Sequence, residues 1–237
     1  MKTGAPNEDA LVCYAARKLG RPVRWRADRG EDFLAAHMGR DQHYDGEVAL
    51  DKDGRILALR ITTYANLGGV PVGSSAIIPL LLGPKVQTTV YHVPAVDYRV
   101  YGLLTNTMAT GAYRGAGRPE ANYLMERLIE QAAREMRLDS AEIRRRNFIR
   151  PDQFPYKTHV DDWYDAGEFA RVLARALAAA DWSGFAARRK DAERRGRLRG
   201  RGLACYLEWT GAPIRTELAM AVNFPIAASA TSQFSPR

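Results

Sequence analysis

Apolar residues recur at helical spacing in two segments of the chain. In residues 7–20, Asn7 can cap a helix and Gly20 can end it. The apolar positions between these two residues follow the helical repeat: Leu11, Val12, Ala15, Ala16 and Leu19. From about residue 120 to 137, a longer stripe has the same repeat: Ala121, Leu124, Met125, Leu128, Ala132 and Met136. Both segments are predicted to form amphipathic helices.

Other segments have the composition and turn residues of extended chain. The stretch HYDGEVALDKDGRILALRITTYANLGG (43–69) predicts a β-hairpin or meander that turns at DKDG (51–54) and has a long second strand. AVDYRVYGLLTNT (95–107) predicts a further extended segment, while PVRWRAD (22–28) and GLACYLEWTG (202–211) predict shorter strands. The apolar run IIPLLLG (77–83) is expected to pack in the core.

Two further helices are expected in the second half of the chain. One begins after Asp139 or Ser140, with Glu142 in a capping-box pattern, and the other runs from about 166 to 180. The segment RPDQFPYKTHVDDWYDAG is rich in proline and aspartate, which indicates a domain connection. Because strands and helices do not alternate in a repeating βα order, the predicted fold class is α+β.

The composition of the 237-residue chain is that of a globular protein, with 46% hydrophobic and 26% charged residues. Its longest apolar run is interrupted by Pro79, so no membrane span is predicted. The N-terminus lacks the apolar core of a secretory signal. Two distant cysteines, Cys13 and Cys205, and scattered histidines do not have metal-ligand spacing. No metal ligand is therefore predicted, and a cytoplasmic location is expected.

The net charge of +8 is concentrated in RRKDAERRGRLRGRG (188–202) and IRRRNFIR (143–150). Clustered arginines can neutralise the phosphates of a nucleic acid. However, no aromatic residues interleave with the arginines of 188–202, and no known nucleic-acid-binding module surrounds them. A solvated surface or a subunit contact is therefore favoured, and nucleic-acid binding stays open as an alternative.

The loop TGAYRGAGRPE (110–120), in front of the longer amphipathic helix, gives the clearest indication of chemistry. It places Arg114 beside Gly115, and then Gly117 and Arg118 directly before the helix. A helix N-terminus presents unsatisfied N–H groups and a positive dipole end, and an arginine can grip an anion through two parallel hydrogen bonds. The spacing matches neither a dinucleotide-binding motif nor a P-loop. The loop is therefore predicted to bind an anion of another kind.

The segment AYRGAGRPEANYLMERLIEQAAREMRLDSAEIRRRNFI (112–149) resembles a known family. It is similar to the molybdenum-cofactor-binding large subunits of the xanthine dehydrogenase, aldehyde oxidase and aerobic carbon monoxide dehydrogenase family. The resemblance continues backwards through DALVCYAARKLGRPVRWRADRGEDF and the hairpin, and it covers about residues 1 to 210 in the same order. It implies an α+β fold that consists of part of the first molybdopterin-binding domain and the beginning of the second.

The resemblance implies roles for five residues of the loop. Arg114 matches the arginine that lies against the cofactor, and Tyr113 occupies the aromatic position before it. Gly115 and Gly117 would let the backbone approach the pterin and its phosphate. Gly115 also falls where carbon monoxide-oxidising members have a copper-binding cysteine, which argues against that activity. Ala116 falls where other members place an aromatic ring over the substrate, so it is expected to line the substrate pocket.

The resemblance also implies how the chain is divided. Residues 1–150 would be the C-terminal part of the first molybdopterin-binding domain, 151–201 a linker and helix with the basic segment, and 202–237 a truncated start of the second domain. A GGGFGGK-like cofactor loop would precede the chain, and the glutamate that acts as the base would lie beyond Arg237. We therefore expect a truncated or frameshifted gene product without a catalytic residue of its own.

The implied function is that of a fragment of a molybdenum hydroxylase, which oxidises an aldehyde, an N-heterocycle or a related small molecule with oxygen from water. The implied cofactor is molybdenum-molybdopterin in its cytosine dinucleotide form. The implied partners are an iron–sulfur subunit with 2Fe-2S clusters and an FAD subunit, in a dimer of heterotrimers. The alternatives are a non-catalytic remnant or subunit-interaction module and, less favoured, a basic nucleic-acid-binding protein.

Overall fold

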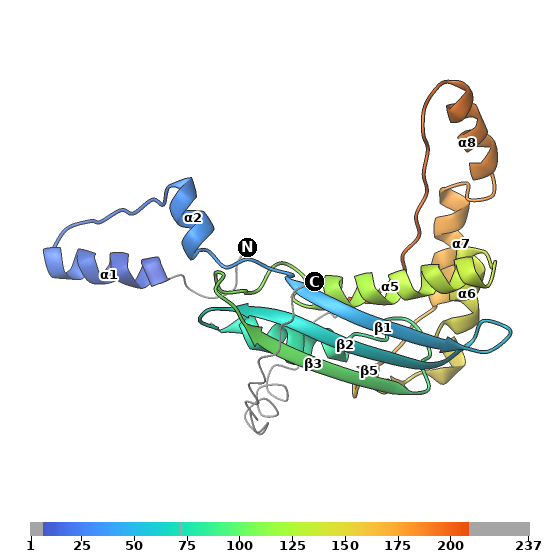
Figure 1. Ribbon diagram of the computed structural model, residues 1–237, viewed down its shortest axis with the longest axis horizontal. Helices are drawn as coiled ribbons and strands as arrows, with labels where there is room; N and C mark the ends of the chain where they lie inside the picture. The colour runs from blue at the N-terminus through green and yellow to red at the C-terminus, as the bar shows by residue number, and fades with distance from the viewer. Residues whose placement is uncertain (1–6, 72, 209–237) are drawn as a thin grey trace, which may run out of the picture. The chain divides into compact units, whose positions relative to one another are not determined.

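The computed structural model describes residues 7–71 and 73–208 (Figure 1). Its helices and strands are, in chain order, α1 (Asn7–Leu19), α2 (Arg29–Ala35), β1 (Gln42–Leu50), β2 (Ile56–Gly68), α3 (Ser74–Ile77), the π-helix η1 (Ile78–Leu82), α4 (Gly83–Lys85), β3 (Val96–Leu104), α5 (Arg118–Glu135), α6 (Ser140–Asn147), the 3-10 helix η2 (Pro151–Gln153), β4 (Tyr156–Lys157), β5 (Trp163–Tyr164), α7 (Phe169–Ala179) and α8 (Phe185–Arg194). This arrangement confirms the expected α+β class.

The larger sheet has the strand order β1-β2-β3. Strands β1 and β2 form the predicted antiparallel hairpin, and β2 is the long second strand of 13 residues. The Asp51 carboxylate closes the turn, since it accepts hydrogen bonds from the backbone N–H groups of Asp53 and Arg55 at 2.9 and 2.8 Å. Strand β3 pairs parallel to β2, which requires a crossover through α3, η1 and α4.

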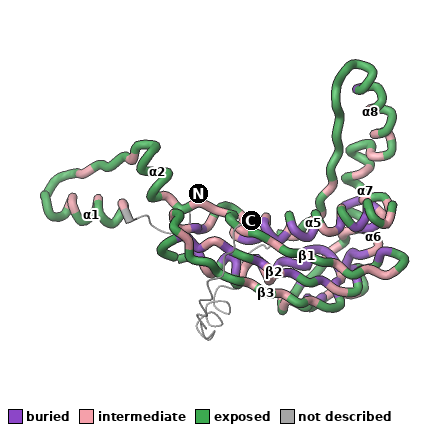
Figure 2. The backbone as a smooth tube through the Cα atoms, in the orientation of Figure 1, coloured by how far each residue is buried: buried purple, intermediate pink, exposed green. Residues whose placement is uncertain are grey.

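Helix α5 packs its apolar stripe against one face of this sheet, and buried residues follow both elements (Figures 1 and 2). Strand β1 alternates between half-buried and exposed positions, so only one of its faces points to the helix. At Gly46 a Cβ atom would lie 3.1 Å from the Leu124 Cδ1 atom, which shows how closely the helix approaches the strand. The amphipathic helix predicted from 120 to 137 is thus confirmed.

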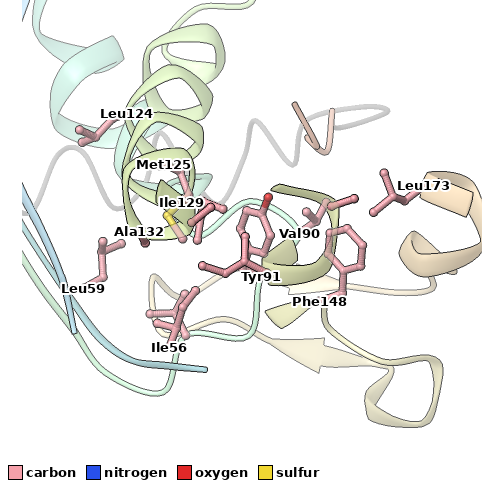
Figure 3. Packing of buried hydrophobic residues seen from close by; sticks show 14 of the residues in the cluster. Ile56, Leu59, Val90, Tyr91, Leu124, Met125, Ile129, Ala132, Phe148 and Leu173 are labelled. Atoms are coloured by element: carbon pink, nitrogen blue, oxygen red, sulfur yellow. The ribbon is translucent and has the colours of Figure 1, made fainter. Parts of the chain in front are cut away.

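The main core joins the sheet to α5, α6 and α7 (Figure 3). Its fully or nearly fully buried members include Ile56, Leu59, Val90, Tyr91, Met125, Ile129, Phe148 and Leu173. The Tyr91 and Phe148 rings stack with centroids 5.7 Å apart. Burial of this many large side chains is the main favourable term for folding.

A charged group lies inside this core. The Arg144 side chain is 0% exposed, and its Nη2 and Nε atoms donate to the Glu126 Oε2 atom at 2.9 and 3.0 Å. Arg144 also donates to the Glu130 carboxylate at 3.3 Å and to the Leu203 carbonyl at 3.1 Å. The Tyr91 hydroxyl donates to Glu126, and burial of the phenol holds the pKa of Tyr91 well above its ordinary value. Every partner of the buried guanidinium is thus an acceptor, as a buried cation requires.

Several smaller predictions are confirmed, one of them only in part. Asp139 is the N-cap of α6, since its carboxylate accepts from the N–H groups of Ala141 and Glu142 at 2.8 and 3.2 Å. Helix α7 lies within the segment predicted for it. In the run IIPLLLG, Ile78 and Pro79 are buried, whereas Ile77 and Leu80 are exposed, so only part of that run belongs to the core. The segment 150–167 also contains the small β4–β5 hairpin, whose Tyr156 and Tyr164 pack on Ile149.

Two strand predictions are wrong. Residues 22–28 form no strand, and the segment ends at Asp28, which caps α2 through a capping box with Glu31. Residues 202–208 also form no strand in the described part of the chain, and 209–211 lie outside it. Leu203, Cys205 and Leu207 nevertheless pack on the core. In the described part of the chain neither segment pairs with a strand, and periodicity alone cannot reveal whether a partner strand exists.

The basic segment is only partly paired, through the two carboxylates of its own helix, Asp191 and Glu193. Arg189 pairs with Glu193 at 2.9 Å and Arg195 with Asp191 at 2.6 Å. Arg201 lies over the Trp182 ring at 3.8 Å from its centroid. In the described ranges, no helix is long and apolar enough to cross a bilayer.

Arg144→Met tests the buried ion pair. The substitution leaves the Glu126 carboxylate buried without its cation, so we expect the free energy of unfolding in urea to fall by about 3–5 kcal/mol. The control is Arg145→Met, because Arg145 pairs with Glu142 at the surface and should contribute at most about 1 kcal/mol. Adding Glu126→Leu to Arg144→Met should recover much of the loss. Equal losses in the two single variants would contradict a structural role for the pair.

Candidate functional site

The loop that precedes α5 is held by segments distant in the sequence. The Gly111 N–H donates to the Met38 carbonyl at 2.8 Å, and the Ala112 N–H donates to the Ser74 hydroxyl at 2.9 Å. The Ser75 hydroxyl donates to the Thr110 carbonyl. These contacts place the loop between the start of β1 and the crossover that leads to β3. The loop is therefore a fixed part of the fold.

Gly115 and Gly117 are required by the conformation of the loop itself. They have φ angles of +99° and +90°, which favour glycine. A Cβ atom on Gly117 would lie 2.8 Å from the Gly83 backbone nitrogen, and one on Gly115 would lie 2.6 Å from the Pro119 Cγ atom. Two contacts within the chain thus account for both glycines before any ligand is considered.

Arg40 is the residue that holds the loop from the sheet side. Its Nη2 atom donates to the Arg114 carbonyl at 2.5 Å, and its guanidinium lies 4.4 Å from the centroid of the Tyr113 ring. Its Nε atom lies 3.9 Å from the Glu120 Oε2 atom. Arg40 therefore joins three points of the loop and of the first turn of α5.

The predicted cofactor residues lie together in one turn. The Ala116 N–H donates to the Tyr113 carbonyl at 2.8 Å, and the Arg118 Nη1 atom donates to the Gly115 carbonyl at 3.1 Å. Arg118 thus braces the loop from within, as its place beside Pro119 suggests. The Arg114 side chain is exposed, and it forms no hydrogen bond or ion pair with any residue in the described ranges. Its guanidinium is therefore available to a ligand.

A pocket with a cavity volume of about 10 Å³ opens beside the loop. Its lining is mostly polar: Arg40, Asp41, Gln42, Asn66, Ser74, Ser75, Ile78, Pro79, Thr110, Gly111 and Glu120. The Glu120 side chain is only 8% exposed, and its Oε2 atom has no hydrogen-bond partner in the described part of the chain. Burial chiefly, and the charge of Glu120 among other groups, raise the pKa of Tyr44 well above its ordinary value. The pocket therefore contains a carboxylate that pairs with Arg40 but has one oxygen without a hydrogen-bond donor in the described part of the chain.

Sequence reasoning missed Arg40 and Glu120. Arg40 lies 74 positions before Arg114, so no local pattern connects them. The sequence does contain a signal for Glu120. A carboxylate in the first turn of a helix usually lies at the surface, where it interacts with the helix dipole. Glu120 instead comes directly before the apolar stripe of the helix, so burial could have been expected. Among the described residues, no group of three or more His, Cys, Asp or Glu side chains could hold a metal ion.

Comparison with known proteins identifies relatives of this chain. The family model described as "Molybdopterin cofactor-binding domain" matches residues 1–148. The chain is 38% identical over 210 residues to the carbon monoxide dehydrogenase large chain of Hydrogenophaga pseudoflava, a match that covers 85% of this chain and 26% of the relative. It is 31% identical to subunit gamma of the 6-hydroxypseudooxynicotine dehydrogenase complex of Paenarthrobacter nicotinovorans, over 89% of this chain and 27% of the relative.

The structural comparison gives the same kind of relative. Quinoline 2-oxidoreductase from Pseudomonas putida 86 superposes with a TM-score of 0.73 at 35% sequence identity. The match covers 80% of this chain and 24% of that structure. This chain thus spans about a quarter of the length of the relatives that it matches.

Arg40→Ala tests the attachment of the loop. Loss of a hydrogen bond from a charged donor, about 1.5–3 kcal/mol, should raise amide hydrogen exchange in residues 111–117 at least tenfold. Arg40→Lys should restore only part of the protection, because lysine lacks the planar fork and stacks poorly on Tyr113. Arg60→Ala is the control, since Arg60 forms exposed ion pairs on the sheet. Unchanged exchange in Arg40→Ala would show that the loop is held by other contacts.

Gly115→Ala tests the crowding argument against a matched glycine. Gly196 also has a positive φ angle, +66°, but a Cβ atom there would meet nothing within 4 Å. Gly196→Ala should therefore lower the free energy of unfolding only by the cost of a left-handed backbone conformation, about 1–2 kcal/mol. Gly115→Ala should cost about 1–3 kcal/mol more, because Pro119 must also move. Chemical denaturation of both variants measures the difference, and equal costs would rule out the steric contribution.

Proposed function

This chain belongs to the molybdopterin cofactor-binding family of the xanthine dehydrogenase, aldehyde oxidase and carbon monoxide dehydrogenase enzymes, and we propose that it forms part of the large subunit of a molybdenum hydroxylase. The reaction proposed for the whole enzyme is the hydroxylation of an aldehyde, an N-heterocycle or a related small molecule with oxygen from water. When bound, the molybdenum cofactor supplies the redox chemistry of that reaction.

The exposed Arg114 guanidinium is the observation that carries this proposal. The backbone of Arg114 is held by Arg40, whereas its side chain has no partner in the described ranges. Helix α5 begins at Arg118, so the loop also lies at a positive dipole end. An anionic, acceptor-rich group such as a pterin with its phosphate suits this combination. The residues present therefore fit the cofactor.

The other loop residues receive supporting roles in this proposal. Tyr113, which is 60% exposed beneath Arg40, would give the cofactor a rigid aromatic neighbour. Gly115 and Gly117 would keep the backbone free of side chains that could block its approach. Ala116, at φ +41°, would line the substrate side of the loop and leave room there. We assign no catalytic base to this chain.

Gly115 also bears on the kind of substrate. Glycine has no ligand atom for copper, and a side chain at this position would collide with Pro119. We therefore favour the oxidation of an organic molecule over that of carbon monoxide, although a carbon monoxide dehydrogenase large chain is among the relatives. The cytosine dinucleotide form of the cofactor, iron–sulfur and FAD subunits in a dimer of heterotrimers, and a cytoplasmic location complete the proposal.

Arg114→Ala tests the proposed role in cofactor binding. A suitable host protein is the Hydrogenophaga pseudoflava large chain, with residues 1–207 of this chain replacing its matched segment. Loss of a charge-assisted hydrogen bond, about 1.5–3 kcal/mol, should weaken cofactor retention roughly ten- to hundredfold. Molybdenum and pterin contents of the purified chimera are the measurements.

Two comparisons make this experiment specific. Arg118→Ala should retain far more cofactor than Arg114→Ala, since Arg118 contacts the Gly115 carbonyl within the loop. Arg114→Lys should rescue poorly, because lysine keeps the charge but loses the planar fork. Normal molybdenum and pterin contents in Arg114→Ala would show that the loop serves only as the entry to α5.

A further inference from the structure

Strand β3 lies at one edge of the larger sheet. The strand order is β1-β2-β3, and in residues 7–71 and 73–208 no strand pairs with the other side of β3 (Figure 1). The Leu59 N–H donates to the Ala95 carbonyl at 2.9 Å, directly before β3. Because the backbone groups of successive residues face opposite edges of a strand, the odd-numbered residues of β3 face β2. The N–H and carbonyl groups of the even-numbered residues therefore face the open edge: Val96, Tyr98, Val100, Gly102 and Leu104.

The open edge lacks the residues that usually protect an edge strand. Proline and lysine often keep such an edge from pairing with another chain. The sequence VDYRVYGLL of β3 contains neither of them. Side chains on both faces of its last part are exposed, with Tyr101 at 49% and Leu104 at 68%. Strand β3 can therefore accept a further strand, and burial of these side chains would favour the pairing.

A row of aromatic side chains crosses the outer face of the sheet and ends at this edge. His43, Tyr64 and Tyr101 lie opposite one another on the three strands. The His43 and Tyr64 ring centroids are 6.2 Å apart, and the Tyr64 and Tyr101 rings stack at 5.5 Å. Tyr101 is the last ring of the row, so a strand added to β3 places a side chain against its free side. A cation or another ring suits the face of an aromatic ring.

We propose that β3 pairs with β3 of a second copy of this chain, antiparallel and about a two-fold axis at Val100. In this register the open backbone groups meet their equivalents. Val100 lies opposite Val100 of the second copy, and Tyr98 lies opposite Gly102. Val96 lies opposite Leu104, so the whole strand is paired. Each of these opposed pairs consists of even-numbered residues, whose N–H and carbonyl groups face the open edge and can exchange hydrogen bonds.

The side chains are compatible with the same register. Arg99 of one copy lies opposite Tyr101 of the other, where its guanidinium can cover the free side of the ring. Asp97 lies opposite Leu103, so no like charges oppose each other. Within one copy, Asp97 and Arg99 already pair at 3.2 Å, and their charges cancel. The outer row of each sheet is thus continued by a cation from the second copy.

The other edge strand, β1, does not suit the same kind of pairing. Antiparallel pairing of β1 with itself about Gly46 would place Asp45 opposite Glu47, and like charges directly opposite each other are destabilising. Both carboxylate side chains are well exposed, at 67% and 70%. Strand β1 therefore has charges of the kind that protect an edge, and β3 is the edge that fits an identical copy. This inference does not rest on the function proposed above, because it needs neither the cofactor nor the loop.

Sedimentation of the purified 237-residue chain tests the pairing. Over a dilution series into the micromolar range, we expect a reversible dimer with twice the 26.4 kDa mass of one chain. Tyr101→Lys should raise the dissociation constant at least tenfold, because a lysine beside Arg99 of the second copy replaces attraction by repulsion at two symmetric places. Tyr64→Lys is the matched control. It removes the other ring of the same stack and adds the same charge away from the edge, so it should change the constant far less.

Disulfide trapping tests the register. In a hydrogen-bonded antiparallel pair, the two Val100 Cα atoms lie about 5.5 Å apart, which is within the range of about 4.4–6.8 Å that a disulfide spans. Val100→Cys should therefore link two copies on oxidation, as a dimer band on a non-reducing gel. The background is Cys13→Ser, because Cys13 is exposed. Ala49→Cys, at an exposed position of β1, is the control in the same background and should stay unlinked.

Several results would overturn the proposal. These are a monomer at every concentration, growth beyond a dimer, equal dissociation constants for Tyr101→Lys and Tyr64→Lys, or a link through Ala49→Cys in place of Val100→Cys. The trapping experiment does not use the Tyr101 variant, so it remains decisive even if Tyr101→Lys unfolds. Molybdenum content in the Arg114 experiment is measured separately, so either idea can fail alone.

Discussion

The position of α5 depends on one buried interaction, the pairing of Arg144 with Glu126. Apolar contacts hold the helix against the sheet. They would tolerate small shifts of the helix along its own axis, because hydrophobic burial is not directional. The two hydrogen bonds to Glu126 Oε2 have fixed geometry inside the core, and any slip would leave a buried charge unpaired. Because Arg144 also holds Glu130 and the Leu203 carbonyl, the same guanidinium joins α5, α6 and the segment after α8. The N-terminus of α5, and with it the loop, is therefore placed from the middle of the helix.

Some residues of the loop at that N-terminus are required by the fold, and others are not. Gly115 and Gly117 are explained by Pro119 and Gly83, and Arg118 by the Gly115 carbonyl. Within the loop, the fold does not explain the unengaged Arg114 guanidinium. Arg114 consequently carries the functional argument, whereas the glycines, which first draw attention in the sequence, carry less of it.

Local patterns predicted the parts of the fold that local physics determines. The β1–β2 hairpin follows from its turn, α5 from its apolar stripe, and the Asp139 cap from the residues beside it. The segments 22–28 and 202–208 have strand-like composition, but a strand exists only where another strand supplies its hydrogen bonds. For the same reason the parallel pairing of β3 with β2 could not be predicted. Tyr113 and Arg114 are predicted site residues through resemblance alone, whereas Arg40 and Glu120 lie 80 positions apart and meet only after the sheet and helix have packed.

The similarity to a carbon monoxide dehydrogenase large chain and the side-chain chemistry at Gly115 favour different activities. The match to a carbon monoxide dehydrogenase large chain extends over most of this chain, which establishes common ancestry of the fold. A shared fold is set by many core residues, however, whereas a metal ligand is set by a single side chain. Gly115 supplies none, and Pro119 occupies the space into which one would project. A thiol at this position would require both a new side chain and a different entry to α5.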